Sequence, residues 1–107
     1  MKKPIVWTIA GSDSGGGAGI QADIKVINLF GAHDCSAITA LTAQNTIGTG
    51  RLEWVAPDML SAQLEALKAD LPPAAVKLGM LGTAAAVEMV SAFLKTAKSP
   101  SPSVIRF

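Results

Sequence analysis

The sequence is poor in several residue types, and each shortage excludes a class of protein. Its 107 residues include one cysteine, no tyrosine and only 5% aromatic residues. Because a disulfide needs two cysteines, Cys35 cannot form a disulfide-bonded scaffold, and a reducing, cytoplasmic location is expected. Nine lysine and arginine residues against eight acidic ones leave no basic surplus, so no nucleic-acid partner is expected.

Long apolar runs are also missing. The sequence has no stretch of about 18 uncharged apolar residues, so we expect no membrane span. Residues 35–50 carry no charge, but their serine, threonine, glutamine and asparagine side chains would be costly to bury in lipid. Lys2 and Lys3 before apolar residues 4–10 imitate a signal peptide, yet the run is short and leads into Gly11 rather than a cleavage site.

The chain does contain a regular alternation of strand-like and helix-like patterns. Half of its residues are hydrophobic, which is enough to bury a core. Apolar runs typical of strands occupy residues 5–10, 37–43, 53–55 and 75–80, with another starting at 104–105. Helical spacing of apolar residues is found at 18–30, 57–71 and 83–97. This alternation predicts an α/β fold with three α/β/α layers and a mostly parallel sheet.

The loop between the first predicted strand and the first predicted helix is the most prominent candidate site. Residues 11–19 read GSDSGGGAG. Glycines let backbone N–H groups approach a ligand closely, and the N-terminus of the following helix favours a negative or polar group. Because ligands of open α/β sheets bind outside the carboxyl ends of the strands, a binding site is favoured here over a flexible turn.

Known phosphate-binding motifs fit this loop poorly. A P-loop ends in Gly-Lys-Ser/Thr, and no lysine lies between Pro4 and Lys25. Residues 17–22 match the G-x-G-x-x-A pattern of dinucleotide sites, but the second strand ends at Gln44 and Asn45 rather than at the acidic residue that would hold a ribose. A nicotinamide-dinucleotide-binding domain is therefore kept only as an alternative.

Several side chains are expected at the same edge of the sheet. Gly11, Gln44 and Met80 end three successive predicted strands, and this convergence favours a shared pocket over a core-filling role for the methionine. The amide of Gln44 can donate and accept, which matches a heterocycle edge that does both. Asp23, one turn beyond the glycines, either accepts hydrogen bonds from a ligand or complements the helix dipole, and Asp13 is expected to cap that helix.

Other polar residues are given structural roles. His33 and Cys35 are expected in the turn before the second strand, at the opposite end of the sheet, with no further ligand nearby, so no metal site is predicted. Residues 46–51 are predicted to be a glycine-rich loop. Lys77 falls within a buried-strand pattern, and we expect it near a sheet edge or with its ammonium group reaching solvent.

Three long motifs, in this order, carry a family resemblance. They are TIAGSDSGGGAGIQAD at residues 8–23, ITALTAQNT at 38–46 and VKLGMLG at 76–82. Together they resemble the N-terminal signature of the hydroxymethylpyrimidine/phosphomethylpyrimidine kinases of thiamine biosynthesis. The resemblance covers approximately residues 4–95. Pyridoxal kinases are relatives with a similar fold, but residues 15–21 resemble the pyrimidine kinases more.

The resemblance implies a ribokinase-like fold and a kinase that uses ATP and Mg²⁺. Members transfer the γ-phosphate of ATP to the hydroxymethyl group of 4-amino-5-hydroxymethyl-2-methylpyrimidine, and then to the monophosphate of that pyrimidine. Carried over by motif, Gly11, Asp23, Gln44 and Met80 would bind this small-molecule substrate.

Length is the main departure from the family, whose members are more than twice as long. Their C-terminal half carries the glycine-rich anion hole, the catalytic cysteine and most of the nucleotide site, and Cys35 does not lie in the corresponding motif. We therefore expect residues 1–107 to be a truncated, N-terminal portion of one kinase domain, with 96–107 a divergent tail and no catalytic residue. The alternative is an inactive pyrimidine- or pyridoxal-binding fragment. A strand edge left unpaired would favour a homodimer.

Overall fold

The computed structural model describes residues 3–96 and 103–106 of the chain. Strands and helices alternate, as predicted. Their order is β1 (Ile5–Asp13), α1 (Gly19–Leu29), β2 (His33–Gln44), β3 (Thr49–Trp54), α2 (Pro57–Asp70), β4 (Ala75–Leu78), α3 (Ala84–Thr96) and β5 (Ser103–Arg106). The strand expected to start at 104–105 is therefore present, whereas Ala97 and most of the Ser/Pro-rich segment that follows lie outside the described residues.

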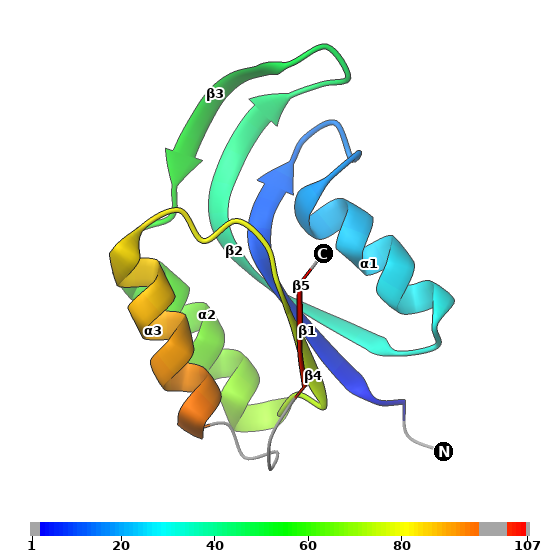
Figure 1. Ribbon diagram of the computed structural model, residues 1–107, viewed down its shortest axis with the longest axis vertical. Helices are drawn as coiled ribbons and strands as arrows, with labels where there is room; N and C mark the ends of the chain where they lie inside the picture. The colour runs from blue at the N-terminus through cyan, green and yellow to red at the C-terminus, as the bar shows by residue number, and fades with distance from the viewer. Residues whose placement is uncertain (1–2, 97–102, 107) are drawn as a thin grey trace.

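The strands form one sheet in the order β3-β2-β1-β4-β5. Strand β1 pairs in parallel with β2 and β4, and β4 pairs in parallel with β5, whereas β3 runs antiparallel to β2. Helix α1 covers one face of the sheet, and α2 and α3 cover the other (Figure 1). The predicted three-layer arrangement and mostly parallel sheet are confirmed.

The apolar core lies between the sheet and the pair α2 and α3. Because successive side chains of a strand point to opposite faces, Trp7 and Ile9 of β1 face this layer together. They pack with Val76 of β4, Leu64 of α2 and Val90 of α3, each at most 1% exposed. This interlocked layer fixes the relative positions of β1, β4 and the two helices, and thereby the edge where the strands end.

Local signals in the sequence account for the helix ends. Helix α2 begins at Pro57, where a missing N–H group costs no hydrogen bond. Thr83 accepts a hydrogen bond from the N–H of Ala86 at 3.1 Å through its Oγ1, so it caps the N-terminus of α3. After α1, Gly31 adopts a φ of 74°, which a residue with a side chain rarely takes.

Several strand boundaries differ from the sequence-based prediction. Strand β1 runs to Asp13 and not only to residue 10, and β4 ends at Leu78 and not at residue 80. Strand β2 starts at His33, so His33 and Cys35 lie within the strand and not in a preceding turn. Residues 49–54 form the antiparallel edge strand β3, in place of the predicted loop at 46–51 and short strand at 53–55. Every residue of β3 is exposed. The strand therefore lacks the alternation of apolar and polar residues from which a strand is predicted.

Candidate functional site

Asp13 organises the glycine-rich loop after β1. Its Oδ1 accepts a hydrogen bond from the N–H of Gly15 at 2.7 Å, and its Oδ2 accepts from the N–H groups of Gly17 and Ala18 at 2.9 Å each. The side-chain amide of Gln44, and then these backbone N–H groups, hold the pKa of the Asp13 carboxyl below its ordinary value although burial opposes them. The predicted helix cap is wrong in detail, because the carboxylate fixes the loop and not the first turn of α1.

A cavity of about 320 Å³ opens at the carboxyl edge of the sheet, beside this loop. Its wall combines the end of β1, the glycine loop, the β2 and β3 strands and the segment around β4. Gly11, Gln44 and Met80 all line it. The remaining lining residues are Ala10, Ser12, Asp13, Ala18, Gly19, Thr42, Thr49, Leu52, Lys77 and Gly79. Three of the four predicted substrate-binding residues are thus brought together around one cavity.

Met80 reaches this cavity because the facing residue has no side chain. A Cβ added at Gly11 would lie 2.8 Å from Cε of Met80, which is closer than such atoms approach. The hydroxyl of Thr39 donates to the carbonyl oxygen of Met80 at 2.6 Å and fixes the backbone there. Met80 is 42% exposed, so it forms part of an open apolar wall and not part of the core.

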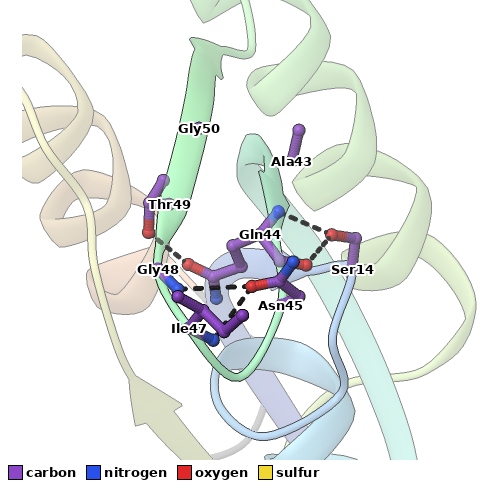
Figure 2. Close-up of a pocket in the computed structure, with 8 residues that line it drawn as sticks. All are labelled: Ser14, Ala43, Gln44, Asn45, Ile47, Gly48, Thr49 and Gly50. Carbon is purple, nitrogen blue, oxygen red and sulfur yellow. Dashed lines mark hydrogen bonds between the residues drawn. The ribbon is translucent and has the colours of Figure 1, made fainter.

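Gln44 stands where the loop after β1 meets the hairpin of β2 and β3. Figure 2 shows the hydroxyl of Ser14 against the Gln44 backbone, where it accepts from the N–H at 2.8 Å. The hydroxyl of Thr49 donates to Oε1 of Gln44 at 2.6 Å, across the hairpin (Figure 2). A second, more open cavity of about 590 Å³ lies around the hairpin turn, and Gln44 and Thr49 line both cavities.

Asp23 lies beneath the cavity, between α1 and the sheet. It is 5% exposed, and its Oδ2 accepts hydrogen bonds from Oγ1 of Thr8 at 2.6 Å and from Nζ of Lys77 at 3.0 Å. Lys77 itself lines the cavity, whereas Asp23 is not among the lining residues. The substrate-binding role of Asp23 therefore stays a prediction.

The expected placement of Lys77 near a sheet edge or reaching solvent is wrong. Lys77 belongs to β4, which lies between β1 and β5, and it is only 8% exposed. The ion pair with Asp23 stabilises the charged ammonium group there. Lys77, Thr49 and Ser14 are the site residues that sequence reasoning missed. A lysine in a buried-strand pattern requires an acidic partner, and this requirement could have identified Lys77 as part of an ion pair.

The other end of β2 has no link to this site. His33 and Cys35 pair in register with Ile5 and Trp7, at the end of the sheet opposite the cavity, as predicted. Burial raises the pKa of the Cys35 thiol, and the nearby charges of Asp34 and Asp70 add to this, so the thiol is not an activated nucleophile. Among residues 3–96 and 103–106, no group of three or more metal-ligating side chains gathers. No helix in the described part of the chain is long and apolar enough to cross a membrane.

Comparison with known proteins identifies the family of this chain. The family model described as phosphomethylpyrimidine kinase matches residues 13–105. This chain belongs to that family. The hydroxymethylpyrimidine/phosphomethylpyrimidine kinase of Synechococcus elongatus is 53% identical over 91 residues, which are 85% of this chain and 35% of that protein. The Mycobacterium tuberculosis enzyme of the same name is 44% identical over 105 residues, covering 98% of this chain and 38% of that protein.

Solved structures agree with the family assignment. A phosphomethylpyrimidine kinase from Clostridium difficile superimposes with a TM-score of 0.88 at 40% identity, over 97% of this chain and 44% of that one. A Staphylococcus aureus pyridoxal kinase in complex with AMP-PCP and pyridoxal gives a TM-score of 0.87 at 27% identity, over 99% of this chain and 39% of that one. The ribokinase-like fold implied by the motifs is confirmed, and the chain spans between a third and two fifths of the length of these curated relatives.

Proposed function

We propose that this chain forms the acceptor-binding part of an ATP-dependent kinase that phosphorylates 4-amino-5-hydroxymethyl-2-methylpyrimidine and its monophosphate in thiamine biosynthesis. The observation that carries the proposal is the convergence of Gly11, Gln44 and Met80 on one cavity at the carboxyl edge of the sheet. These residues lie in the family motifs, and family membership supports a pyrimidine over the nicotinamide alternative. On this proposal, residues 1–107 correspond to the N-terminal portion of a single kinase domain.

Each lining residue has a chemical task in this proposal. The open backbone at Gly11 lets a flat ring lie against the sheet edge, and the side chain of Met80 packs on one face of that ring. The amide of Gln44 both donates to and accepts from the polar edge of the pyrimidine. Asp23 would act from beneath, through the Lys77 ammonium that reaches the cavity wall.

The proposal assigns acceptor binding, and no catalytic residue, to this chain. ATP would supply the phosphoryl group that the whole kinase transfers. Within the described residues no cluster suits a magnesium ion, so we assign no Mg²⁺ ligand here. The buried thiol of Cys35 lies at the far end of β2 and is given no part in the reaction.

Titration calorimetry on the 107-residue chain tests the proposal. The aminopyrimidine is expected to bind, and Gln44→Ala is expected to weaken binding about tenfold, because about 1.4 kcal/mol of polar recognition is lost. Asn28→Ala, at an exposed position on α1, serves as the matched control and should leave affinity unchanged. Adding ATP and Mg²⁺ should produce no phosphorylated pyrimidine, because the chain carries no catalytic group in this proposal.

The same titration with pyridoxal addresses the second candidate function, which the likeness to pyridoxal kinases favours. Tighter binding of pyridoxal than of the aminopyrimidine would reverse the substrate assignment. If Asn28→Ala weakens binding as much as Gln44→Ala does, the proposal that this cavity binds the pyrimidine is contradicted.

A cytoplasmic location and self-association are also part of the proposal. The free, buried thiol of Cys35 supports a reducing compartment. Strand β3 is an exposed edge of the sheet, and such an edge offers unpaired backbone groups to a second copy. Analytical ultracentrifugation should therefore detect a dimer at micromolar concentration, and a monomer throughout that range would contradict this part.

A further inference from the structure

The side-chain amide of Gln21 bridges two consecutive residues at the end of β1. Its Oε1 accepts a hydrogen bond from the backbone N–H of Asp13 at 2.8 Å, and its Nε2 lies 2.7 Å from Oγ of Ser12. Gln21 belongs to the first turn of α1, so the bridge joins the strand and the helix on either side of the glycine loop. Ser12 is half-buried and lines the cavity at the carboxyl edge of the sheet, whereas Gln21 is not among the lining residues.

The backbone N–H of Asp13 fixes the orientation of this amide. A backbone N–H can only donate, so the atom of Gln21 that faces it must be the carbonyl oxygen. The amide nitrogen then faces Ser12, and because this nitrogen can only donate, the hydroxyl oxygen of Ser12 accepts. Turning the amide over would set two donors against each other at Asp13.

The Ser12 hydroxyl therefore keeps its own hydrogen for another partner. A serine hydroxyl carries one hydrogen and two lone pairs, and the bond from Gln21 uses a lone pair. In the part of the chain that the structure describes, no residue accepts a hydrogen bond from this hydroxyl. The hydroxyl of Thr42 donates to the Ser12 carbonyl oxygen at 2.7 Å and fixes the backbone here against β2. The hydrogen is thus available to a molecule in the cavity that Ser12 lines.

We propose that Ser12 is a further substrate-binding residue, whose hydroxyl donates to an acceptor atom of the ligand, and that Gln21 is a positioning residue that leaves this hydrogen free. This inference rests on the proposed function and adds one residue to the four assigned by motif. The favoured ligand group opposite Ser12 is an oxygen or a ring nitrogen with a lone pair. A ligand that covered Ser12 without such an atom would bury the hydroxyl hydrogen unpartnered, which weakens binding.

Calorimetry on the 107-residue chain with 4-amino-5-hydroxymethyl-2-methylpyrimidine measures this contact. Ser12→Ala should weaken binding about fivefold, because one hydrogen bond to the ligand is lost. Ser91→Ala, which removes a hydroxyl from an exposed position on α3, is the matched control and should leave the affinity unchanged. Equal affinities of Ser12→Ala and the unaltered chain would overturn the proposal.

Gln21→Glu tests the direction of the hydrogen bond while the serine stays in place. A carboxylate at position 21 keeps one oxygen for the N–H of Asp13 but replaces the donor that faces Ser12 by an acceptor. The hydroxyl then donates to the carboxylate and its hydrogen is lost to the ligand, so binding should again weaken about fivefold. Affinity equal to that of the unaltered chain, in a variant that circular dichroism shows to be folded, would contradict the role of Gln21.

The double variant that combines Ser12→Ala with Gln21→Glu controls for the added charge. If Gln21 acts through the Ser12 hydroxyl, the double variant should bind as weakly as Ser12→Ala and no more weakly, because the two changes remove the same interaction. A further loss as large as that caused by Gln21→Glu alone would contradict the positioning role, because the charge would then act on the ligand without Ser12.

The orientation of the Gln21 amide can be measured by NMR without a ligand. In the labelled chain, the hydrogen bond from the Asp13 N–H should give a scalar coupling between the Asp13 nitrogen and Cδ of Gln21. Its absence, in spectra that show such couplings between β1 and β2, would overturn the arrangement even if Gln21→Glu fails to fold. Failure of the pyrimidine to bind the unaltered chain contradicts the proposed function together with this inference, whereas binding that Ser12→Ala leaves unchanged contradicts this inference alone.

Discussion

The two faces of the central sheet carry buried side chains of opposite polarity. On the face under α2 and α3, Trp7 and Ile9 of β1 pack against apolar side chains and are fully buried. On the face under α1, the intervening residue Thr8 is equally buried but bonds to Asp23, which also holds Lys77. The alternation of one strand thus separates an apolar layer that stabilises the fold from a polar layer directly beneath the cavity at the carboxyl edge.

This difference shows which buried residues contribute little to the stability of the fold. Apolar burial stabilises a fold, whereas a buried ion pair seldom adds stability over an apolar pair of similar volume. Nevertheless Asp23 and Lys77 are both nearly buried, with side chains 7% and 10% exposed. Because Lys77 also lines the cavity, the pair places a charged group at the cavity wall, and a role of Asp23 in substrate binding stays a prediction.

The largest effect is expected on the apolar face. Trp7→Ala should lower the free energy of unfolding by about 5 kcal/mol, because it empties a fully buried site and removes the 2.7 Å bond from the indole Nε1 to the Leu71 carbonyl. Urea denaturation followed by circular dichroism measures this loss. If Trp7→Ala lowers the free energy of unfolding by less than Lys77→Met does, the apolar face under α2 and α3 is not the main source of stability.

A smaller loss is expected when the ion pair is broken from one side. Lys77→Met should cost about 3 kcal/mol, because the Asp23 carboxylate keeps its burial and loses its cation. Adding Asp23→Leu to this variant should recover most of the stability, while pyrimidine binding stays impaired. If the double variant is no more stable than Lys77→Met, the ion pair is a stabilising element and the contrast between the two faces fails.

Removing one hydrogen bond from the polar face should matter less. Thr8→Val keeps the volume of the side chain but removes the donor to Asp23, and about 1.5 kcal/mol should be lost in the same urea experiment. Ser36→Ala, at the half-buried position of β2 that pairs with Thr8, provides a comparison within the neighbouring strand. If both variants lose the same free energy of unfolding, the hydrogen bond from Thr8 to Asp23 contributes no more to stability than the side chain of Ser36.

The smallest effect on stability concerns the glycine loop and depends on pH. The pKa of Asp13 in the folded chain lies below its ordinary value of 3.8, so the stability that its ionised form contributes is present above that pH and disappears as pH falls through the folded pKa. Asp13→Asn should therefore destabilise the chain at pH 7 and converge with the unaltered chain in strongly acidic solution. Thermal melts across this pH range measure the convergence, and a gap that widens on acidification would have the wrong sign.

Much of the fold follows from sequence because its signals are local. The apolar runs around Trp7 and Val76 each specify a strand, and the apolar spacing at 57–71 and 83–97 specifies helices α2 and α3. All four elements occur where they were predicted, to within a few residues at their ends. The fold of α3 shows the limit of this reasoning. Val87 is one of the apolar residues in the helical pattern at 83–97, yet it is 50% exposed, because the helix turns Ala86 toward the core instead.

Pairwise contacts between distant residues could not be predicted in the same way. The bond from Lys77 to Asp23 joins positions 54 residues apart, and a pattern within β4 alone gives no information about its partner. The first part of strand β3, which falls in the predicted loop at 46–51, was missed because its side chains are exposed and carry no apolar pattern, and only the backbone pairing with β2 makes it a strand. The sequence therefore predicts that Gly11, Gln44 and Met80 lie at one edge of the sheet, although only Gln44 is the last residue of its strand. The contacts of Thr49 and Lys77 at the cavity require the structure.

Chemical-shift mapping by NMR tests the central claim most directly. When 4-amino-5-hydroxymethyl-2-methylpyrimidine is titrated into the labelled 107-residue chain, the largest backbone shifts should fall at Gly11, Gln44 and Met80 and fade toward His33 at the other end of the sheet. Shifts that gather elsewhere, or none at millimolar ligand, would contradict the account of this edge as the pyrimidine site.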